Sequence, residues 1–467
     1  MKTTKTLYLY LGIAGTLLPL QAAAQEKPNI LFILADDLGI GDITPYGQQL
    51  IRTPNLQRLA NQGLVFTQAY AGSTVSAPSR CSLMTGLNTS HTAIRGNVRV
   101  EPEGQAPMPA GTYTVAKLLQ EAGYATGCFG KWGLGYPGSV STPEKMGFNE
   151  FFGYNCQTRA HDYYPDHLWD GTERIELPGN YEQQEAVYSG DLIHGKALDF
   201  IRANAGAPFF AYLSYTLPHA ELRLPEDSVF DYYCTLIPKS DEKPYSEADP
   251  FRVGAYGAQQ RPLAAFASMV ERLDSYVGEI MNLLQELGIA DNTLLVFTSD
   301  NGPHREGGAD PSYFKSSGPF RGIKRDLYEG GIRVPMIVRY PGHTPAGAST
   351  DLMIAFWDML PTFAEFAGVP VPVPTDGISF APLLKKKSRG AGRRIFYWEL
   401  HEGGGKQAVR QGRWKAVRLN ANYPDRATFE LYDLSKDIHE DRNVAERHPV
   451  KARKLLRIME EANFKSQ

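Results

Sequence analysis

The sequence predicts an α/β fold: a large, mainly parallel sheet flanked by helices, followed by a smaller C-terminal α+β domain. Short, near-continuous apolar runs alternate with helical patterns over most of the chain, which is typical of strands buried on both faces of a parallel sheet. From about residue 390 onward the pattern changes to alternating strands. The chain has 467 residues, 42% hydrophobic and 21% charged. This composition supplies one large core and a smaller one, and it excludes a disordered chain.

Four apolar runs are predicted to be buried strands: "NILFILA" (29–35), "YATGCFG" (124–130), "PFFAYLSY" (208–215) and "TLLVFTS" (293–299). Helical periodicity is found between and after them, in "TPNLQRLANQG" (53–63), "VAKLLQEAG" (115–123), "ASMVERLDSYVGEIMNLLQELG" (267–288) and "DLMIAFWDMLPTFAEFAG" (351–368). Strands that alternate with helices in this way indicate βαβ units.

The N-terminus is predicted to be a signal peptide covering residues 1–24. Two lysines precede an apolar stretch from Leu7 to Leu20, and small residues end at Ala24, the expected cleavage point. A membrane anchor is less favoured because the stretch is short and glycine and proline interrupt it. We therefore expect the protein to cross the inner membrane into the periplasm, without stable membrane insertion. A formal net charge of −3 gives no reason to expect nucleic acid.

The remaining chain divides into a catalytic domain, 25–389, and a C-terminal domain, 390–467. The boundary follows the proline-rich 369–377 and lies in the basic segment "KKKSRGAGR" (385–393). The second domain is predicted to hold antiparallel strands and a final helix, in segments 394–400, 406–419, 428–434 and 448–464. Four widely spaced cysteines match no metal-binding cluster; they could form a disulfide or be small buried side chains.

Two polar pairs follow predicted strands. Asp36 and Asp37 come directly after 29–35, and Asp300 and Asn301 directly after 293–299. Ligands of open α/β sheets bind beyond the carboxyl ends of the strands, so the pairs are expected to converge. Each pair alone could be a solvated loop. Together they offer oxygen ligands only, which suit a hard cation, and Ca²⁺ is favoured over Mg²⁺ because the protein supplies so many of them.

The stretch "SAPSR" places Ser76, Pro78 and Arg80 before a predicted helix. Pro78 is expected at the first residue of the helix, where its missing N–H costs nothing. Ser76 then lies at the helix mouth, where free N–H groups and the helix dipole favour an anion, and Arg80 can reach back to the same point. A plain serine N-cap is the alternative.

With its extension, "SAPSRCSLMTG" (76–86) resembles the signature of the type I sulfatases in the alkaline-phosphatase superfamily. The resemblance implies that Ser76 is oxidised to formylglycine, the nucleophile, and that Arg80 supports it. A serine at this position resembles the bacterial form that an anaerobic maturation enzyme modifies before export. An unmodified serine hydroxyl without an adjacent base would be a poor nucleophile, so the modification gives the motif a chemical purpose.

The resemblance continues in "PNILFILADDLGIGD" (28–42), "GYATGCFGKWGLG" (123–135), "SYTLPHA" (214–220), "FTSDNG" (297–302) and "RGIKRDLYEGGIRVPMIVRYPG" (321–342). It implies that Lys131 and Lys324 bind sulfate and that His219 protonates the leaving sugar oxygen. It also implies a Ca²⁺ site, whose expected ligands are Asp36, Asp37, Ser76, Asp300 and Asn301.

One position departs from the family pattern. Many members carry a histidine two residues after the first lysine, where this chain has Gly133. That histidine hydrogen-bonds the formylglycine diol, so another group or water must do this work. His161 is the first candidate, although a lone loop histidine is often only solvated.

The predicted substrate is a sulfated galactose or N-acetylgalactosamine, hydrolysed from a chain end, with the 4-position first. Aromatic and polar residues near glycines suit the rim of a sugar-binding site. The predicted substrate-binding residues are His161, Tyr163, Trp169, Glu399 and His401. The alternative is that these side chains pack in the core. Two competing functions remain. A phosphodiesterase or phosphonate hydrolase of the superfamily would carry a second cluster of His and Asp ligands, and none is apparent in the sequence. A non-catalytic binder of sulfated glycans would not need the intact Ser-x-Pro-x-Arg motif.

Overall fold

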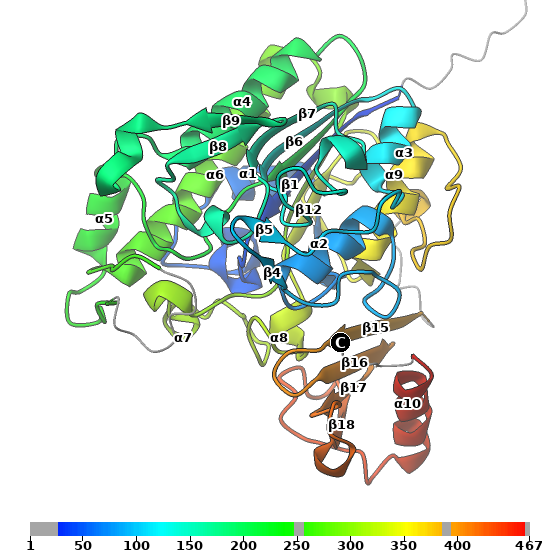
Figure 1. The fold of residues 1–467 in the computed structure, drawn as a ribbon. Coiled ribbons are helices and arrows are strands. Elements are labelled where there is room, and N and C mark those ends of the chain that lie inside the picture. The colour runs from blue at the N-terminus through cyan, green and yellow to red at the C-terminus, as the bar shows by residue number, and fades with distance from the viewer. Residues whose placement is uncertain (1–26, 247–255, 385–393, 463–467) are drawn as a thin grey trace, which may run out of the picture.

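The computed structural model describes residues 27–246, 256–384 and 394–462 (Figure 1). The predicted signal peptide and the predicted domain boundary at residues 389 and 390 lie outside these ranges. A 10-stranded sheet runs through the larger part of the molecule in the order β13-β2-β12-β11-β1-β10-β6-β7-β8-β9. A separate 4-stranded sheet, β15-β16-β17-β18, forms the smaller part.

The centre of the large sheet is parallel. β1 (Asn29–Ala35) lies between β10 (Phe209–Ser214) and β11 (Thr293–Ser299), and β6 (Ala125–Lys131) and β7 (Glu150–Tyr154) continue the parallel order. These strands confirm the four predicted ones to within a residue or two. The edges add antiparallel pairs through β2 (Leu64–Phe66), β8 (His167–Asp170), β9 (Glu173–Glu176) and β12 (Met336–Arg339), and β13 (Ala348–Thr350) pairs parallel with β2. The predicted fold class is confirmed.

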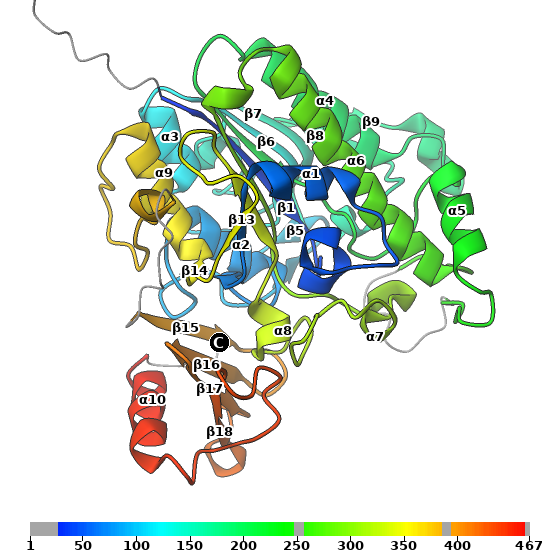
Figure 2. The same cartoon turned by 180° about the vertical axis from the view of Figure 1, so that it is seen from behind.

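Helices cover both faces of the sheet, as the two views in Figures 1 and 2 show. Successive side chains of a strand point to opposite faces. Leu31 and Ile33 of β1 therefore join the core under α1 (Pro54–Gln62), α4 (Ser189–Ala203) and α6 (Pro262–Glu286). Ile30 and Phe32 join the other core, under α2 (Ser76–Thr85), α3 (Val115–Glu121) and α9 (Met359–Ala367).

Two helix predictions need correction. The predicted helix 351–368 begins only at Met359, because Ile354 and Ala355 form β14 and the Asp358 carboxylate accepts the Ala355 N–H, ending the extended segment. Helix α2 begins at Ser76, so Pro78 is its third residue and not its first. Proline fits there as well, since the first four N–H groups of a helix have no acceptor within it.

Short elements complete the larger part: β3 (Ala69–Tyr70), which pairs with β14 (Ile354–Ala355), β4 (Arg99–Val100), β5 (Gly104–Gln105), α5 (Ser228–Leu236), α7 (Pro311–Phe314) and α8 (Glu329–Ile332).

The smaller part has the predicted antiparallel sheet and final helix. It consists of β15 (Ile395–Leu400), β16 (Lys406–Gln411), β17 (Trp414–Leu419), β18 (Thr428–Asp433) and α10 (Pro449–Glu461). One face packs on α10 through Leu455 and Met459. The other face contributes Trp398 to a core that also contains Tyr70 and Trp357 of the larger part. The two sheets are therefore joined by a shared apolar core.

All four cysteines are free thiols, and Cys81, Cys128 and Cys156 are buried. Of the two alternatives left by the sequence, a disulfide or small buried side chains, the structure therefore has the second. Among the described residues, no helix has the length and apolar character needed to cross a membrane.

Candidate active site

The two polar pairs meet because their strands are neighbours. Ala35 at the end of β1 is in register with Ser299 at the end of β11, so the residues that follow lie side by side. The Asp37 N–H donates to Asp300 Oδ1 over 3.1 Å, and Asn301 Nδ2 donates to Asp37 Oδ1 over 2.6 Å. Asp36, Asp37, Asp300 and Asn301 are all buried. The predicted convergence at the carboxyl edge of the sheet is present.

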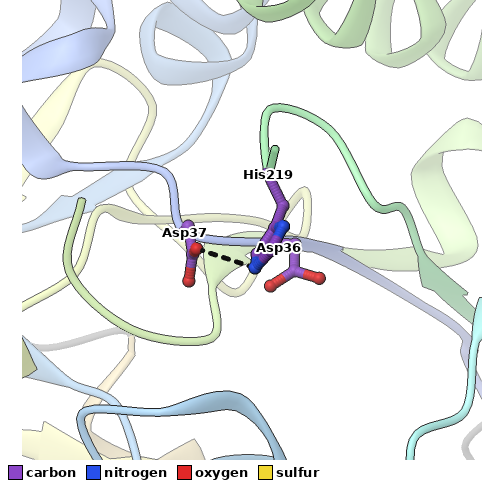
Figure 3. A group of neighbouring side chains, drawn as sticks. All are labelled: Asp36, Asp37 and His219. Atoms are coloured by element: carbon purple, nitrogen blue, oxygen red, sulfur yellow. Dashed lines mark ion pairs between the residues drawn. The ribbon is translucent and has the colours of Figure 1, made fainter. Parts of the chain in front are cut away.

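His219 reaches this cluster from the loop after β10, and Figure 3 shows its ring between the two aspartates. Its Nε2 lies 3.2 Å from Asp37 Oδ2 and 2.9 Å from Lys324 Nζ. The opposite ring nitrogen, Nδ1, lies 2.5 Å from the Ala220 carbonyl and must donate to it, because a carbonyl only accepts. Nε2 therefore accepts from the Lys324 ammonium, which also donates to Asp37 Oδ2 over 2.6 Å.

Ser76 lies on the other side of Asp36, at the first residue of α2. Its Oγ is 3.1 Å from Asp36 Oδ1 and 3.2 Å from Lys131 Nζ, and the residue is only 1% exposed. Lys131, the last residue of β6, also donates to Asp36 Oδ2. The Ser76 hydroxyl, the Asp36 carboxylate and the Lys131 ammonium are therefore mutual hydrogen-bond neighbours at the buried N-terminus of α2.

Arg80 fixes the back of the site. Its Nε and Nη2 donate to Asp300 Oδ2 over 3.0 and 2.8 Å, and Nη1 donates to the Lys131 carbonyl over 3.0 Å. Nη1 also donates to the Ser214 hydroxyl, which in turn donates to the Lys131 carbonyl over 2.8 Å. Arg80 therefore holds Asp300 and the end of β6 in one orientation.

Burial and the neighbouring cations set the protonation states. Burial, reinforced by Lys324 and Lys131, holds the pKa of His219 well below its usual value. Although burial opposes its charge, the neighbouring Asp37 and Glu306 carboxylates raise the pKa of Lys324. In the pair formed by Lys324 and His219, the lysine carries the proton and the imidazole is neutral.

The residues fit a hard divalent cation. The Asn301 Oδ1 atom is buried and has no hydrogen-bond donor in the described part of the chain, although buried acceptors are normally satisfied. Ligand atoms of Asp36, Asp37 and His219 lie within 4.8 Å of one another. A cation beside these oxygens would satisfy the Asn301 carbonyl and bind the acceptors that a hard ion prefers. The identity of the ion as Ca²⁺ stays a prediction.

A second group of candidate ligands, which was not apparent in the sequence, shares Asp37 with the first. Asp37, His304 and Glu306 also bring ligand atoms within 4.8 Å of one another. They were missed because the cluster borrows Asp37 from the first site. Most of its ligand atoms are already engaged: His304 Nε2 donates to the Pro218 carbonyl, Nδ1 accepts the Glu306 N–H, and Arg325 pairs with Glu306 Oε1. Glu306 Oε2 is buried and has no hydrogen-bond donor among the described residues.

The predicted sugar-binding residues of segment 159–169 have different surroundings. The His161 ring stacks on His219, with centroids 4.4 Å apart and an interplanar angle of 7°. Tyr163 is fully buried, and its hydroxyl bonds the carbonyls of Thr216 and His219 over 2.9 Å each, so it supports the histidine loop from below. Trp169 in β8 is half-buried and donates to Glu103 over 2.9 Å.

Glu399 and His401 are engaged with each other. Glu399 is fully buried, and its Oε1 contacts Arg95 Nη1 at 3.1 Å and His401 Nε2 at 2.9 Å. Its Oε2 accepts the Tyr397 hydroxyl over 2.6 Å. The structure therefore places Glu399 in a polar contact between the two parts of the protein.

Sequence reasoning missed the residues beside Gly133. The three atoms nearest to a Cβ built on that glycine belong to Gln157, whose Nε2 donates to Asn97 Oδ1. No local pattern marks either amide residue. His304 and Glu306 could have been found, since they follow Asn301 closely in "SDNGPHREGG" (299–308).

Comparison with known proteins points to one family. Residues 28–369 match the family model described as Sulfatase, and residues 321–463 match the one described as N-sulphoglucosamine sulphohydrolase, C-terminal. The chain is 33% identical over 414 residues to the dog N-acetylgalactosamine-6-sulfatase, covering 85% of this chain and 72% of that protein. It is 28% identical to the N-acetylgalactosamine-6-O-sulfatase of Bacteroides thetaiotaomicron, covering 93% of both. A crystal structure of Ps i-CgsB superposes with a TM-score of 0.76 at 28% identity, covering 95% of this chain and 94% of that one.

Proposed function

We propose, from the premise that this chain belongs to the sulfatase family and is a sulfuric ester hydrolase, that it releases sulfate from a carbohydrate through a nucleophile at position 76. The placement of Ser76 carries the proposal. Its side chain meets Asp36 and Lys131 at 3.1 and 3.2 Å, at a helix N-terminus that favours an anion. No other serine of α2 lies between a buried carboxylate and a buried ammonium among the described residues.

In the proposed mechanism, the maturation enzyme oxidises Ser76 to formylglycine, whose hydrated aldehyde is the nucleophile. One of its two hydroxyls attacks sulfur as the bond from sulfur to the sugar oxygen breaks, and the second then loses its proton and expels sulfate as the aldehyde forms again. Lys131 lies against this side chain and stabilises negative charge on the sulfuryl oxygens as the S–O bond breaks. Arg80 keeps Asp300 and the end of β6 in place. A divalent cation held by Asp36, Asp37, Asp300 and Asn301 would supply Lewis-acid stabilisation of the same oxygens.

His219 and Lys324 are proposed to deliver the proton to the leaving sugar oxygen. The proton is carried by the ammonium of Lys324, 2.9 Å from His219 Nε2. Because Nδ1 is bonded to the Ala220 carbonyl, the ring orientation is fixed and Nε2 faces the site.

We propose that the sugar is a galactose or N-acetylgalactosamine, attacked from a chain end. The names of the relatives support this sugar, and a structure of Ps i-CgsB in complex with k-i-k-neocarrahexaose supports a saccharide substrate. The sequence favoured the 4-position, whereas those relatives are named 6-sulfatases, so we propose the 6-position first. Ser76 is 1% exposed. A sulfate on the exocyclic carbon can reach such a nucleophile while the ring stays further out.

We further propose export and maturation as the sequence predicts: modification of Ser76 by an anaerobic radical enzyme, then cleavage after Ala24 and residence in the periplasm. N-terminal sequencing of the protein recovered from that compartment tests the cleavage. A chain that keeps its first 24 residues would contradict it.

The activity test measures sulfate released from galactose, N-acetylgalactosamine and N-acetylglucosamine, each sulfated singly at each position. The enzyme is co-produced with a maturation enzyme, and intact mass should show the loss of two hydrogens at residue 76. We expect Ser76→Ala to abolish release, and Ser82→Ala, on the same helix but with an unpartnered hydroxyl among the described residues, to retain it. Preference for a phosphonate ester over these sulfate esters would favour the phosphonate hydrolase alternative. Binding of a sulfated sugar without release of sulfate would favour the non-catalytic glycan binder. Preference for N-acetylglucosamine would contradict the proposed galactose-type sugar.

A further inference from the structure

Helix α2 has no cap of its own beside the nucleophile. Val75 is the N-cap residue, and its side chain cannot accept a hydrogen bond. The N–H of Ala77 instead donates to Asn97 Oδ1 over 3.0 Å. A residue from the loop beyond the helix therefore fixes the peptide unit that follows residue 76.

Gln157 fixes the orientation of that amide. Gly133 has a φ of +71°, and a Cβ built there would lie 3.2 Å from Gln157 Cγ, so the glutamine fills the space beside the glycine. Gln157 is 7% exposed, and its Nε2 donates to Asn97 Oδ1 over 3.2 Å. Asn97 Oδ1 thus accepts from two donors, which prevents the amide from turning its NH₂ group toward Ala77.

The main chain of Asn97 is held from the smaller part of the protein. Its N–H donates to Glu402 Oε1 over 3.1 Å, in the turn between β15 and β16. Although the residue is exposed, it is held at its main chain and at its side chain.

We propose that Asn97 is a positioning residue for the nucleophile, acting through the Ala77 N–H, and that Gln157 holds its amide in the working orientation. The catalytic consequence rests on the proposed function. Fixing the peptide after residue 76 sets the direction of its side chain toward Asp36 and Lys131. Since displacement of a reacting group by about 1 Å can cost on the order of a hundredfold in rate, loss of this bond should lower kcat more than it changes KM.

Four variants separate positioning from packing. Asn97→Leu removes the acceptor and should lower kcat by about ten- to a hundredfold. Asn97→Asp keeps an acceptor, so kcat should recover while KM rises, because the carboxylate repels an anionic ester. Gln157→Glu offers only acceptors and should make the Asn97 NH₂ turn toward it, away from its bond with Ala77, lowering kcat. Gln157→Met keeps the volume and should have a smaller effect than Gln157→Glu.

Asn443→Leu is the matched control. Asn443 Oδ1 also accepts from two donors, here the backbone N–H groups of Leu431 and Ala445 at 3.0 Å each, but it lies in the smaller part of the protein, away from Ser76. It should cost stability and leave kcat unchanged. Equal kcat losses in Asn443→Leu and Asn97→Leu, or an unchanged kcat in Asn97→Leu, would overturn the proposal.

Hydrogen exchange supplies a readout that does not depend on turnover. The Ala77 amide should exchange faster in Asn97→Leu and Gln157→Glu than in the wild type, Asn97→Asp or Asn443→Leu. If the wild type releases no sulfate, the proposed function fails, and the exchange rates still decide the positioning. Equal Ala77 exchange in all five proteins would refute it.

Discussion

His194 should make the protein sensitive to acid. The residue lies in α4 and is 4% exposed. Its Nδ1 is 2.6 Å from the Tyr215 hydroxyl, and its ring stacks on Tyr276 with centroids 4.2 Å apart. Burial lowers the pKa of His194 from 6.5 to about 4. The folded protein therefore holds a neutral imidazole that the unfolded chain would protonate below pH 6.5.

The sign and size follow from proton binding. Between pH 6.5 and about 4 the unfolded state binds more protons at this position, so stability is full above pH 6.5 and falls as the pH drops toward 4. A shift of about 2.5 pKa units corresponds to roughly 3 kcal/mol. The nearby charged groups do little to oppose this lowering of the His194 pKa. Glu279 Oε2 lies 3.3 Å from Nε2, but its side chain is 58% exposed and its attraction is screened. Asp191 and Arg272, which line the adjoining pocket, pair with each other.

The assay compares urea unfolding of the wild type and His194→Phe at several pH values from 7.5 to 4. Phenylalanine keeps the ring but leaves the Tyr215 hydroxyl without a partner, a cost that does not vary over this range. The difference in unfolding free energy should therefore shift in favour of the variant by roughly 3 kcal/mol on acidification. His439→Phe, at a side chain 53% exposed, serves as the surface control for replacing a histidine by phenylalanine. A constant difference for His194→Phe would refute the reasoning.

Three further outcomes are expected. Trp398→Ala should lower the unfolding free energy, measured in urea titrations, by about 3–5 kcal/mol. The reason is that the indole fills the core shared by the two sheets and donates to the Ala71 carbonyl over 2.9 Å. A loss below about 1 kcal/mol would mean that the sheets do not depend on this contact. Asp300→Ala should lose bound metal and turnover together, measured by elemental analysis and sulfate release, and retention of a full equivalent of metal would remove Asp300 from the ligands. Chelation should abolish activity and Ca²⁺ should restore it better than Mg²⁺, whereas full activity after exhaustive chelation would contradict a metal requirement.

Patterns within short segments predicted most of the fold. The apolar runs that became β1, β6, β10 and β11 are recognisable locally because burial on both faces requires continuous apolar sequence. The same logic placed Asp36, Asp37, Asp300 and Asn301 together, since the ends of neighbouring parallel strands must converge. The segment before Met359 failed this approach: its apolar residues fit a helix locally, but pairing of β14 with β3 and the Asp358 bond decided otherwise.

The sequence by itself determined four central strands of the large sheet and which residues stand at their carboxyl ends, because those features follow from burial and from spacing along one segment. Only the tertiary structure decided which residues from distant segments of the chain contact one another. Glu399 appeared suited to a sugar-binding rim, yet it is buried against Arg95, 304 residues away. Asn97 and Gln157 carry no local signal, and they acquire a role only where the loop after α2, the glycine at 133 and the residues after β7 come together. Contacts between distant segments depend on how whole elements pack, which residue type and periodicity do not encode locally.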